Sequence, residues 1–238
     1  MNTKASFEIQ ERPQIIVTGA GKGIGYDLCE VFSSLDCSVA AVSRQESLPF
    51  QSSNVEHIQG DIANSTDVTS KIESHFNSKG APLRVLIHNA GLLVNKPFEE
   101  LLQDEITQMQ SVNYLFPLML TQKLLPWLRG AQHAHVIYIG SMGGFQGSEK
   151  YPGLTVYGSS KAAGAGLMEG LASEYKGSSL SFNALSLGAV DTDMIREAFF
   201  TEVSTMNVRA VSSWIARFAL EGFRVANGQN LPITLGNP

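Results

Sequence analysis

Short apolar runs alternate along the chain with longer stretches in which apolar positions recur every three or four residues. The runs predict strands at residues 15–17, 39–42, 55–58, 85–87, 136–139, 180–187 and 231–235. The longer stretches predict helices at 28–35, 66–76, 99–127, 157–174 and 208–222, with Pro117 and Pro126 expected to kink or end the third. Because the runs lack polar alternation, we expect parallel strands covered by helices on both faces.

No repeat, low-complexity tract or linker interrupts this alternation. The sequence therefore predicts an α/β fold, a doubly wound parallel sheet, in a single domain spanning residues 1–238. In such sheets ligands bind beyond the carboxyl ends of the strands. Residues that directly follow each predicted strand are therefore the candidates for chemistry.

Composition and charge exclude several classes of protein. A length of 238 residues suits one large domain, and a formal charge of 17 − 22 = −5 argues against a nucleic-acid partner held by a broad basic face. The longest strictly apolar run covers residues 114–120, far short of the ~20 positions that span a bilayer, so we expect no membrane partner. The first 14 residues carry charges and no apolar signal region, which predicts a cytoplasmic protein.

The two cysteines, Cys29 and Cys37, stand eight positions apart near a predicted helix. This pattern matches neither a disulfide framework nor a metal-ligand pair. We expect two small buried side chains and no metal site.

The first predicted strand runs into a glycine-rich turn with the sequence Thr18-Gly19-Ala20-Gly21-Lys22-Gly23-Ile24-Gly25. The turn is not a P-loop, because Lys22 is followed by glycine rather than by Ser or Thr. It fits the spacing GxxxGxG, in which small residues let the backbone approach a pyrophosphate at the N-terminus of a helix. The alternative is a tight strand-to-helix connection without a ligand.

The second predicted strand ends at Ser43 and Arg44. A dinucleotide fold specific for NAD places a carboxylate there, about 20 residues beyond the glycines, to bind the adenosine ribose. An arginine instead offers a planar fork for a 2′-phosphate, and Lys22 can lie on the same side. This pair favours NADP(H) as cofactor; the alternative is two ordinary solvated bases.

Tyr157 and Lys161 stand at positions i and i+4 of a predicted helix, on one face. A nearby ammonium favours phenolate and lowers the pKa of a tyrosine from its reference of about 10. Such a tyrosine can exchange a proton with a carbonyl or alcohol oxygen. The alternative is a solvent-facing lysine beside a half-buried tyrosine.

These motifs resemble those of the short-chain dehydrogenase/reductase family, in family order across nearly the whole chain. The matching segments are residues 18–25, Gly60-Asp61-Ile62, His88-Asn89-Ala90-Gly91, Ser111-Val112-Asn113, Ile139-Gly140-Ser141, Tyr157 with Lys161, and residues 183–194. The resemblance implies a single Rossmann-type domain that binds NADP(H) and reduces a carbonyl group by hydride transfer.

The resemblance also implies a role for each matching residue. Tyr157 would act as general acid and Ser141 would donate a hydrogen bond to the reacting oxygen. Lys161 would hold the nicotinamide ribose and lower the pKa of Tyr157, and Asn113 would anchor a water that relays protons to Lys161. The residues expected to bind the cofactor are Thr18, Gly19, Lys22, Gly23, Ile24, Gly25, Ser43, Arg44, Asp61, Ile62, Asn89, Ala90, Gly91, Tyr157, Lys161, Gly188, Val190 and Thr192.

The chain departs from the family pattern at three places. His88 replaces the first Asn of the NNAG motif, where we expect a satisfied interior group with little functional effect. Leu187 stands where the family usually has Pro, which loosens a turn near the nicotinamide. The interval from Ser141 to Tyr157 is longer than usual, which lengthens a loop beside the substrate.

The substrate is the least determined part of the prediction. We expect a small or medium ketone or aldehyde, with a substrate lid at about residues 194–206. An apolar pocket would be made by Phe145, Tyr151, Met194, Phe199 and Phe200, or these side chains would pack on one another.

The runner-up reading is a 3-oxoacyl-[acyl-carrier-protein] reductase. Such enzymes carry arginines that meet the acidic carrier, where this chain has His135 and Ser178, although Arg129 and Lys176 lie nearby. A third possibility is a non-catalytic NADP(H)-sensing protein. The presence of all four catalytic residues of the family, Asn113, Ser141, Tyr157 and Lys161, argues against it. The resemblance also implies a homodimer or homotetramer packed through the helices after strands four and five.

Overall fold

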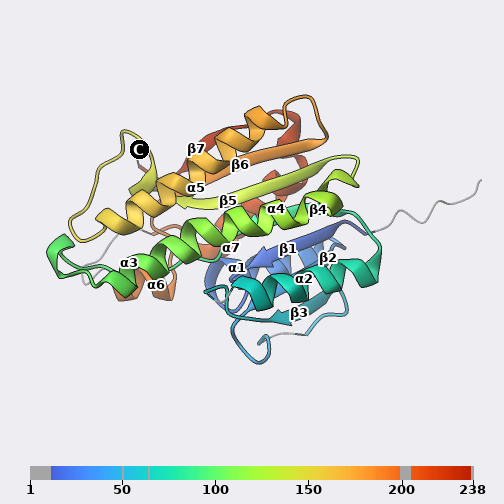
Figure 1. Cartoon of the computed structure of the whole chain (residues 1–238), viewed down its shortest axis with the longest axis horizontal. Coiled ribbons are helices and arrows are strands. Elements are labelled where there is room, and N and C mark those ends of the chain that lie inside the picture. The colour runs from blue at the N-terminus through green and yellow to red at the C-terminus, as the bar shows by residue number, and fades with distance from the viewer. Residues whose placement is uncertain (1–11, 50, 64, 199–204, 237–238) are drawn as a thin grey trace, which may run out of the picture.

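The computed structural model describes residues 12–49, 51–63, 65–198 and 205–236. Its strands form one seven-stranded parallel sheet in the order β3-β2-β1-β4-β5-β6-β7 (Figure 1). The strands are β1 (Gln14–Thr18), β2 (Ser38–Ser43), β3 (Val55–Gln59), β4 (Leu83–His88), β5 (Ala134–Ser141), β6 (Leu180–Leu187) and β7 (Asn230–Ile233). The strand order reverses between β1 and β4, which is where a doubly wound sheet opens a crevice for a ligand.

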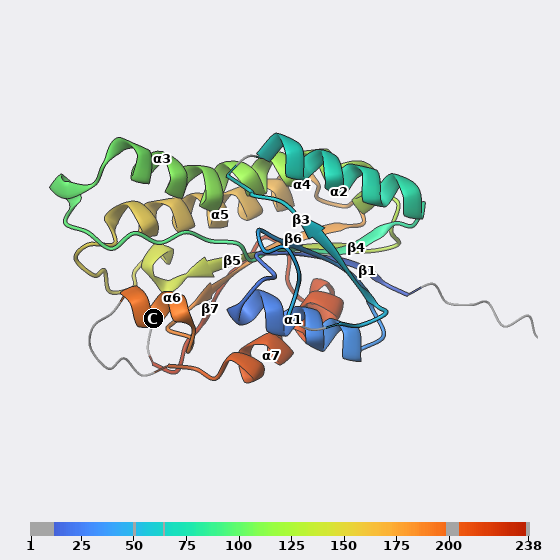
Figure 2. The ribbon, with the colours of Figure 1, turned by 90° about the horizontal axis from the view of Figure 1, so that it is seen from below.

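Helices cover both faces of the sheet, as Figure 2 shows from its edge. The helices α2 (Ser65–Lys79), α4 (Phe116–Arg129) and α5 (Thr155–Glu174) lie on one face, and α1 (Gly23–Ser34) and α7 (Val208–Glu221) lie on the other. Two shorter helices, α3 (Gln103–Gln110) and α6 (Asp193–Ala198), lie beyond the carboxyl ends of the strands. The doubly wound α/β fold predicted from the sequence is confirmed.

Each face of the sheet has its own apolar core. Along β5, Val136 and Tyr138 belong to the core under α4 and α5, whereas Ile137 and Ile139 belong to the core under α1 and α7. All four side chains are buried. Burial on both faces explains why the strand sequences lack polar alternation.

The stretch at residues 99–127, predicted as one long helix kinked at proline, is divided differently. A turn of π-helix at Ser111–Leu115 separates α3 from α4. Pro117 lies in the first turn of α4, and Pro126 is accommodated inside α4. Neither proline ends the helix, and the irregular turn directly precedes Pro117 and carries Asn113.

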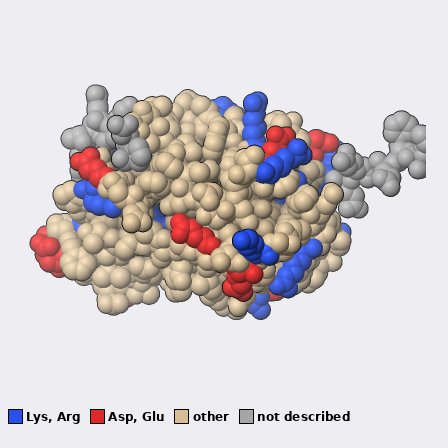
Figure 3. Space-filling view, turned by 90° about the horizontal axis from the view of Figure 1, so that it is seen from above, with Lys and Arg blue, Asp and Glu red and all other residues tan. Residues whose placement is uncertain are grey.

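Charged side chains are sparse and mixed in sign on the face drawn in Figure 3. Blue and red groups stand in small clusters separated by wide uncharged surface. Within the described residues, no helix is long and apolar enough to cross a membrane.

Candidate active site

A cavity of about 580 Å³ opens beyond the carboxyl ends of the central strands. Its walls come from the glycine-rich turn, the ends of β2, β4, β5 and β6, the start of α5, and α6. Predicted site residues that line it are Gly19, Lys22, Gly23, Ile24, Ser43, Arg44, Asp61, Ile62, Asn89, Ala90, Gly91, Ser141, Tyr157, Lys161, Gly188, Val190 and Thr192. Residues separated by up to 173 positions, from Gly19 to Thr192, are thus brought to one crevice, at the point where the strand order reverses.

The glycine-rich turn is closely packed against the end of β4. A Cβ on Gly25 would lie 2.2 Å from the carbonyl oxygen of Gly19 and 2.4 Å from Nδ2 of Asn89. Gly19 has a φ of +70°, and a Cβ there would lie 2.8 Å from Cα of Ala90. Glycine is therefore required at both positions, by close approach of the backbone at Gly25 and by conformation as well at Gly19.

Thr18 supports the cavity from behind instead of lining it. Its hydroxyl donates to the carbonyl of Ile87 at 3.3 Å and accepts from the backbone N–H groups of Asn89 and Ala90, at 3.1 and 3.2 Å. The amide of Asn89 donates to the carbonyls of Thr18 and Gly19. Three predicted site residues do not line the cavity but pack behind its wall: Thr18, Gly25 and Asn113.

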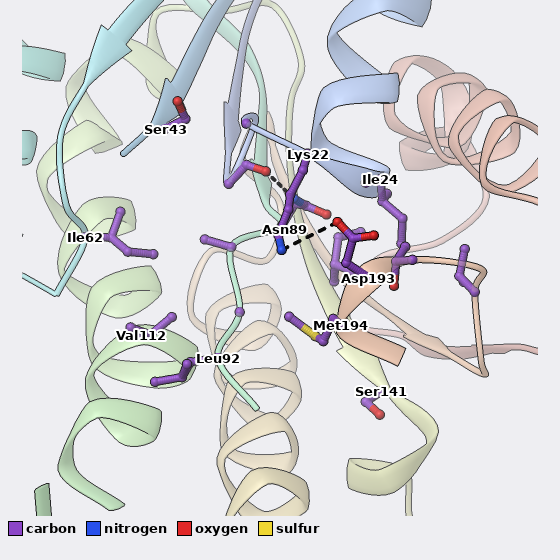
Figure 4. A pocket seen from close by; sticks show the side chains of 18 of the residues that line it. Lys22, Ile24, Ser43, Ile62, Asn89, Leu92, Val112, Ser141, Asp193 and Met194 are labelled. Carbon is purple, nitrogen blue, oxygen red and sulfur yellow. Dashed lines mark hydrogen bonds and ion pairs between the residues drawn. The ribbon is translucent and has the colours of Figure 1, made fainter. Parts of the chain in front are cut away.

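The end of β2 forms the far end of the cavity, at Ser43 in Figure 4. Ser43 is buried, and its hydroxyl shares a hydrogen bond of 2.9 Å with Nε2 of His57 on the neighbouring strand. Arg44 and Gln45 follow on the exposed rim. Asp61, at the end of β3, accepts a hydrogen bond from the N–H of Ala63 at 3.0 Å.

Lys22 faces the first residue of α6 across the cavity (Figure 4). Its ammonium lies 3.7 Å from Oδ2 of Asp193. Arg196 pairs with Oδ1 of the same aspartate at 2.7 Å and also with Asp191. The Arg196 hydrogen bond and the charge of Lys22 lower the pKa of Asp193.

The predicted lid is anchored at both ends of α6. Val190 and Met206 form a bridge that closes the base of the loop. Asn95, in the segment after β4, donates from Nδ2 to the carbonyl of Ala198 at 2.8 Å. Residues 199–204, including Phe199 and Phe200, lie outside the described residues.

Ser141 and Tyr157 meet at the wall of the cavity beyond β5. A hydrogen bond from Ser141 lowers the pKa of the Tyr157 phenol, but burial has the larger effect and raises it overall. Ser141 also accepts from the N–H of Gly143 at 3.1 Å, which fixes its side chain. A phenol and a hydroxyl are thus held side by side, facing the space that a substrate can enter.

Lys161 lies behind Tyr157, and its ammonium is 6.0 Å from the centre of the Tyr157 ring. It donates to the carbonyl of Ile139 at 2.9 Å, and burial lowers its pKa to about 8. The expectation that Lys161 lowers the pKa of Tyr157 is not met in this structure: the ammonium is turned to a carbonyl and the net pKa shift of the tyrosine is upward.

Asn113 is fully buried in the π-helical turn. Its Oδ1 accepts from the N–H of Leu92 at 2.8 Å, and its Nδ2 donates to the carbonyl of Leu92 and to the hydroxyl of Ser160. The side chain of Asn113 thus ties the segment after β4 to α5. Asn113, which the sequence predicts to be catalytic, thus connects two segments of the cavity wall through its side chain.

The substrate end of the cavity differs from the predicted apolar pocket. Met194 lines the cavity as expected, whereas Phe145 and Tyr151 do not. Phe145 is half-buried, and Tyr151 is about half exposed. The lining residues outside the motifs and the lid named from the sequence are Val42, Gln45, Ala63, Leu92 and Gln108.

His88 is buried, as expected of an interior group, but only one of its ring nitrogens is satisfied. Nε2 shares a hydrogen bond of 2.8 Å with the hydroxyl of Thr121, and Nδ1 has no partner among the described residues. Burial lowers the pKa of His88 to about 3, so the ring is neutral near pH 7.

Comparison with known proteins identifies the family. The family model described as short chain dehydrogenase matches residues 13–202. An uncharacterized oxidoreductase of Staphylococcus saprophyticus is 30% identical over 190 residues, which cover 76% of this chain and 75% of the relative.

Solved structures agree in fold. A 3-ketoacyl-(acyl-carrier-protein) reductase from Brucella melitensis, complexed with NADH, has a TM-score of 0.85 at 20% identity, covering 95% of this chain and 98% of that one. The structure of ElxO with NADP bound has a TM-score of 0.83 at 23% identity, covering 94% and 98%. With the family model matching most of its length, the chain belongs to the short-chain dehydrogenase family of oxidoreductases.

Proposed function

We propose that the protein reduces a ketone or aldehyde to an alcohol with NADPH, with Tyr157 as general acid. The observation that carries the proposal is the meeting of Ser141 and Tyr157 at the cavity wall, with Lys161 behind them. The opposite end of the same cavity carries Ser43 and Arg44, so one crevice has room for a dinucleotide between them.

The residues of the cavity fit a dinucleotide. A Cβ on Gly21 would lie 2.9 Å from Cδ of Gln45, and one on Gly188 would lie 2.9 Å from Oγ1 of Thr234, so a side chain does not fit at either place in the cavity wall. Lys22 and Arg44 would bind the 2′-phosphate, Asp61 and Ile62 would contact the adenine, and the loops at residues 89–91 and 188–192 would hold the remainder. A bound NADPH supplies the hydride.

The chain's own residues would manage the proton. The raised pKa keeps the Tyr157 phenol protonated near pH 7, as an acid requires, and the phenol donates its proton to the carbonyl oxygen. Ser141 donates a hydrogen bond to the same oxygen as negative charge develops there. Lys161, whose ammonium has N–H groups to donate, holds the ribose hydroxyls.

The test is NADPH oxidation against a panel of ketones, aldehydes and acyl thioesters. Tyr157→Phe should abolish turnover while leaving NADPH binding, measured by fluorescence, within a few-fold of the unmodified protein. Tyr175→Phe, at the far end of α5, is the matched control and should keep full activity. Undiminished turnover in Tyr157→Phe would exclude Tyr157 as the acid.

The second candidate is a 3-oxoacyl-[acyl-carrier-protein] reductase, as in the Brucella neighbour. Arg129 and Lys176 are exposed and available to an acidic carrier, whereas His135 is buried and hydrogen-bonded to Asn183. Arg129 and Lys176 are thus the two exposed cations named for this surface, which is little positive charge for an acidic carrier protein. We therefore favour the small carbonyl substrate. Reduction of acyl thioesters in preference to free ketones would reverse that order.

One alternative is a protein of the same fold without catalytic activity. A non-catalytic NADP(H) sensor would bind NADPH and reduce nothing on the panel.

A homodimer or homotetramer packed through α4 and α5 is supported by Leu115 and Met119, which are partly exposed apolar side chains at the start of α4. Sedimentation of the purified protein measures the oligomeric state.

A further inference from the structure

His57 is a half-buried histidine that has no part in the proposed function as described so far. It lies on β3, the strand at one edge of the sheet, and pairs in register with Ala41 of β2. Its Nε2 lies 2.9 Å from the hydroxyl oxygen of Ser43, the last residue of β2. Because Ser43 lines the cavity, the imidazole is bonded to a residue of the cavity wall.

Ser43 stands at the end of the cavity where Lys22 and Arg44 are proposed to bind the 2′-phosphate (Figure 4). Its side chain is buried, and its carbonyl accepts from the N–H of Gly60 at 2.9 Å, which fixes the end of β2 against the end of β3. The hydroxyl is the polar side-chain group that Ser43 can offer a ligand. Its orientation depends on the hydrogen bond with His57.

This hydrogen bond can run in either direction. A neutral imidazole donates from one ring nitrogen and accepts at the other, and a hydroxyl donates one proton and accepts at its lone pairs. When Nε2 of His57 carries the proton, it donates to Ser43 and leaves the hydroxyl proton free for the cavity. When Nε2 lacks the proton, Ser43 donates to it. An imidazolium has protons on both nitrogens and therefore allows only the first arrangement.

The two arrangements suit different groups at the adenosine ribose. A 2′-phosphate dianion accepts hydrogen bonds and donates none, so it favours a Ser43 hydroxyl whose proton is free. A ribose hydroxyl donates and accepts, so it can bond to Ser43 in either arrangement. Protonation of His57 therefore strengthens the binding of a phosphate more than that of a hydroxyl, and the added positive charge acts in the same direction.

Charged side chains on the neighbouring elements are paired with one another. Glu56 precedes His57 on β3, points to the opposite face of the sheet and pairs there with His75 and Lys79 of α2. On the face of His57, the α1 carboxylates of Asp27 and Glu30 both pair with the α7 guanidinium of Arg209.

The environment of His57 favours the neutral ring near pH 7. Burial lowers the pKa of His57, and a hydrogen bond to the backbone of Ser43 has a smaller, opposite effect. Arg44 and Glu46, which follow β2, are exposed, and no charged side chain of the described residues contributes to this pKa shift. The ring thus gains its second proton as the pH falls below its usual value of about 6.5.

We propose that His57 is a positioning residue that acts through Ser43 and makes the preference for NADP(H) over NAD(H) depend on pH. The proposal rests on the proposed function, in which the end of β2 binds the 2′-phosphate. As the pH falls, the imidazolium fixes the Ser43 hydroxyl as a donor to the cavity, and the preference for the phosphate increases. By linkage, the bound phosphate raises the pKa of His57.

The test measures binding of the adenosine end of the cofactor alone. Adenosine 2′,5′-bisphosphate carries the 2′-phosphate and 5′-AMP lacks it, so the ratio of their dissociation constants, from calorimetry, measures the preference. Because a phosphate monoester itself gains a proton near about pH 6, each pH is compared with His57→Gln, which keeps a neutral donor and does not titrate. At pH 5 the preference of the unmodified protein should exceed that of His57→Gln by about three- to tenfold, and at pH 8 the two should agree within about twofold.

Two further variants locate the effect. In a Ser43→Ala background, His57→Gln should change the preference by no more than about twofold at pH 5, because the hydroxyl that transmits the effect is gone. His133→Gln removes an exposed imidazole just before β5, at the opposite ends of the strands, and is the matched control. It should leave the preference unchanged at both pH values.

NMR titration of the His57 ring in the unmodified protein needs no variant, since the signal is assigned through bonds to the backbone. With adenosine 2′,5′-bisphosphate bound, the midpoint should be about 0.5–1 pH unit higher than with 5′-AMP bound, which is the same three- to tenfold effect seen by linkage.

Equal preferences for the unmodified protein and His57→Gln at pH 5, or a His57 midpoint that does not respond to the 2′-phosphate, overturn the proposal. A purely structural role would change stability without either effect. Absent binding of adenosine 2′,5′-bisphosphate would overturn the proposal together with NADP(H) as cofactor. Failure of the proposed carbonyl reduction would appear separately, as absent turnover on the substrate panel.

Discussion

Each end of the cavity presents a lysine: Lys22 is exposed and faces a carboxylate, whereas Lys161 is buried and faces none among the described residues. Lys22 is about two-thirds exposed and faces Asp193 at 3.7 Å, in a group of charges that includes Arg196. Lys161 is buried, is bound to one carbonyl, and has a pKa lowered to about 8. An exposed pair changes stability little, whereas an unpaired buried charge is costly and persists only when the surrounding fold imposes it.

The same contrast separates the surroundings of the two lysines. The Lys22 end is built from backbone and surface charge, so its properties should respond to salt and to exchange of single side chains. The Lys161 end is built from buried hydrogen bonds: Asn113 bonds to Ser160 and Tyr138, and Lys161 donates to the carbonyl of Ile139. Changes there should alter stability and proton affinity together.

The largest expected effect is that of Gly25→Ala, which tests whether the Lys22 end depends on backbone packing. The added methyl would overlap the Gly19 carbonyl, so the turn must move. We expect a loss of roughly 3 kcal/mol or more in the free energy of unfolding and loss of measurable NADPH binding. Gly170→Ala, where nothing lies within 4 Å, is the control; equal melting temperatures for the two variants would contradict the prediction.

Lys161→Met should stabilise the protein at pH 7 by roughly 2–3 kcal/mol while removing activity. The folded-state pKa of Lys161 is lowered, to about 8, below that of the unfolded chain. The cost of its burial is therefore fully present below pH 8. It declines as pH rises from 8 toward about 10.5, because the native state loses its proton first.

Urea unfolding at pH 7 and pH 9.5 measures this difference. The advantage of Lys161→Met should be smaller at pH 9.5. Lys22→Met, at the exposed end, should leave stability nearly unchanged at both pH values. A gain for Lys161→Met that does not vary with pH would show that its origin is packing rather than charge.

Arg44→Asp should lower the ratio of kcat/KM for NADPH over NADH by about 10- to 100-fold, since the new carboxylate repels a 2′-phosphate and suits a ribose hydroxyl. Arg217→Asp makes the same charge change on exposed α7 and serves as the control. An unaltered ratio would mean that Arg44 does not read the phosphate.

Asp193→Asn should have the smallest effect. It frees Lys22 for the phosphate, so the affinity for NADPH should rise by at most a few-fold, and more at low salt than at high salt. Fluorescence titrations at two salt concentrations measure both changes. Weaker binding in this variant would indicate that Asp193 itself helps to hold the cofactor.

Much of the fold was predictable because its determinants are local. The strand at residues 180–187 was predicted with its observed bounds. A short apolar run without polar alternation is typical of a strand that is covered on both faces. The π-helical turn at Ser111–Leu115 was not, because apolar positions at helical spacing run through it unchanged. Its position depends on what Asn113 bonds to, and those partners lie in other elements.

The sequence by itself determined the family and the doubly wound sheet, because spacing along the chain specifies motifs. It also predicts Ser141, Tyr157, Lys161, Lys22 and Arg44 as site residues. Only the tertiary structure decided the environment of each group. It turned Lys161 toward Ile139, raised the pKa of Tyr157 by burial, paired Lys22 with Asp193 and placed Tyr138 against Gly164. Burial and long-range contacts control proton affinity, and neither can be read from residues taken in order.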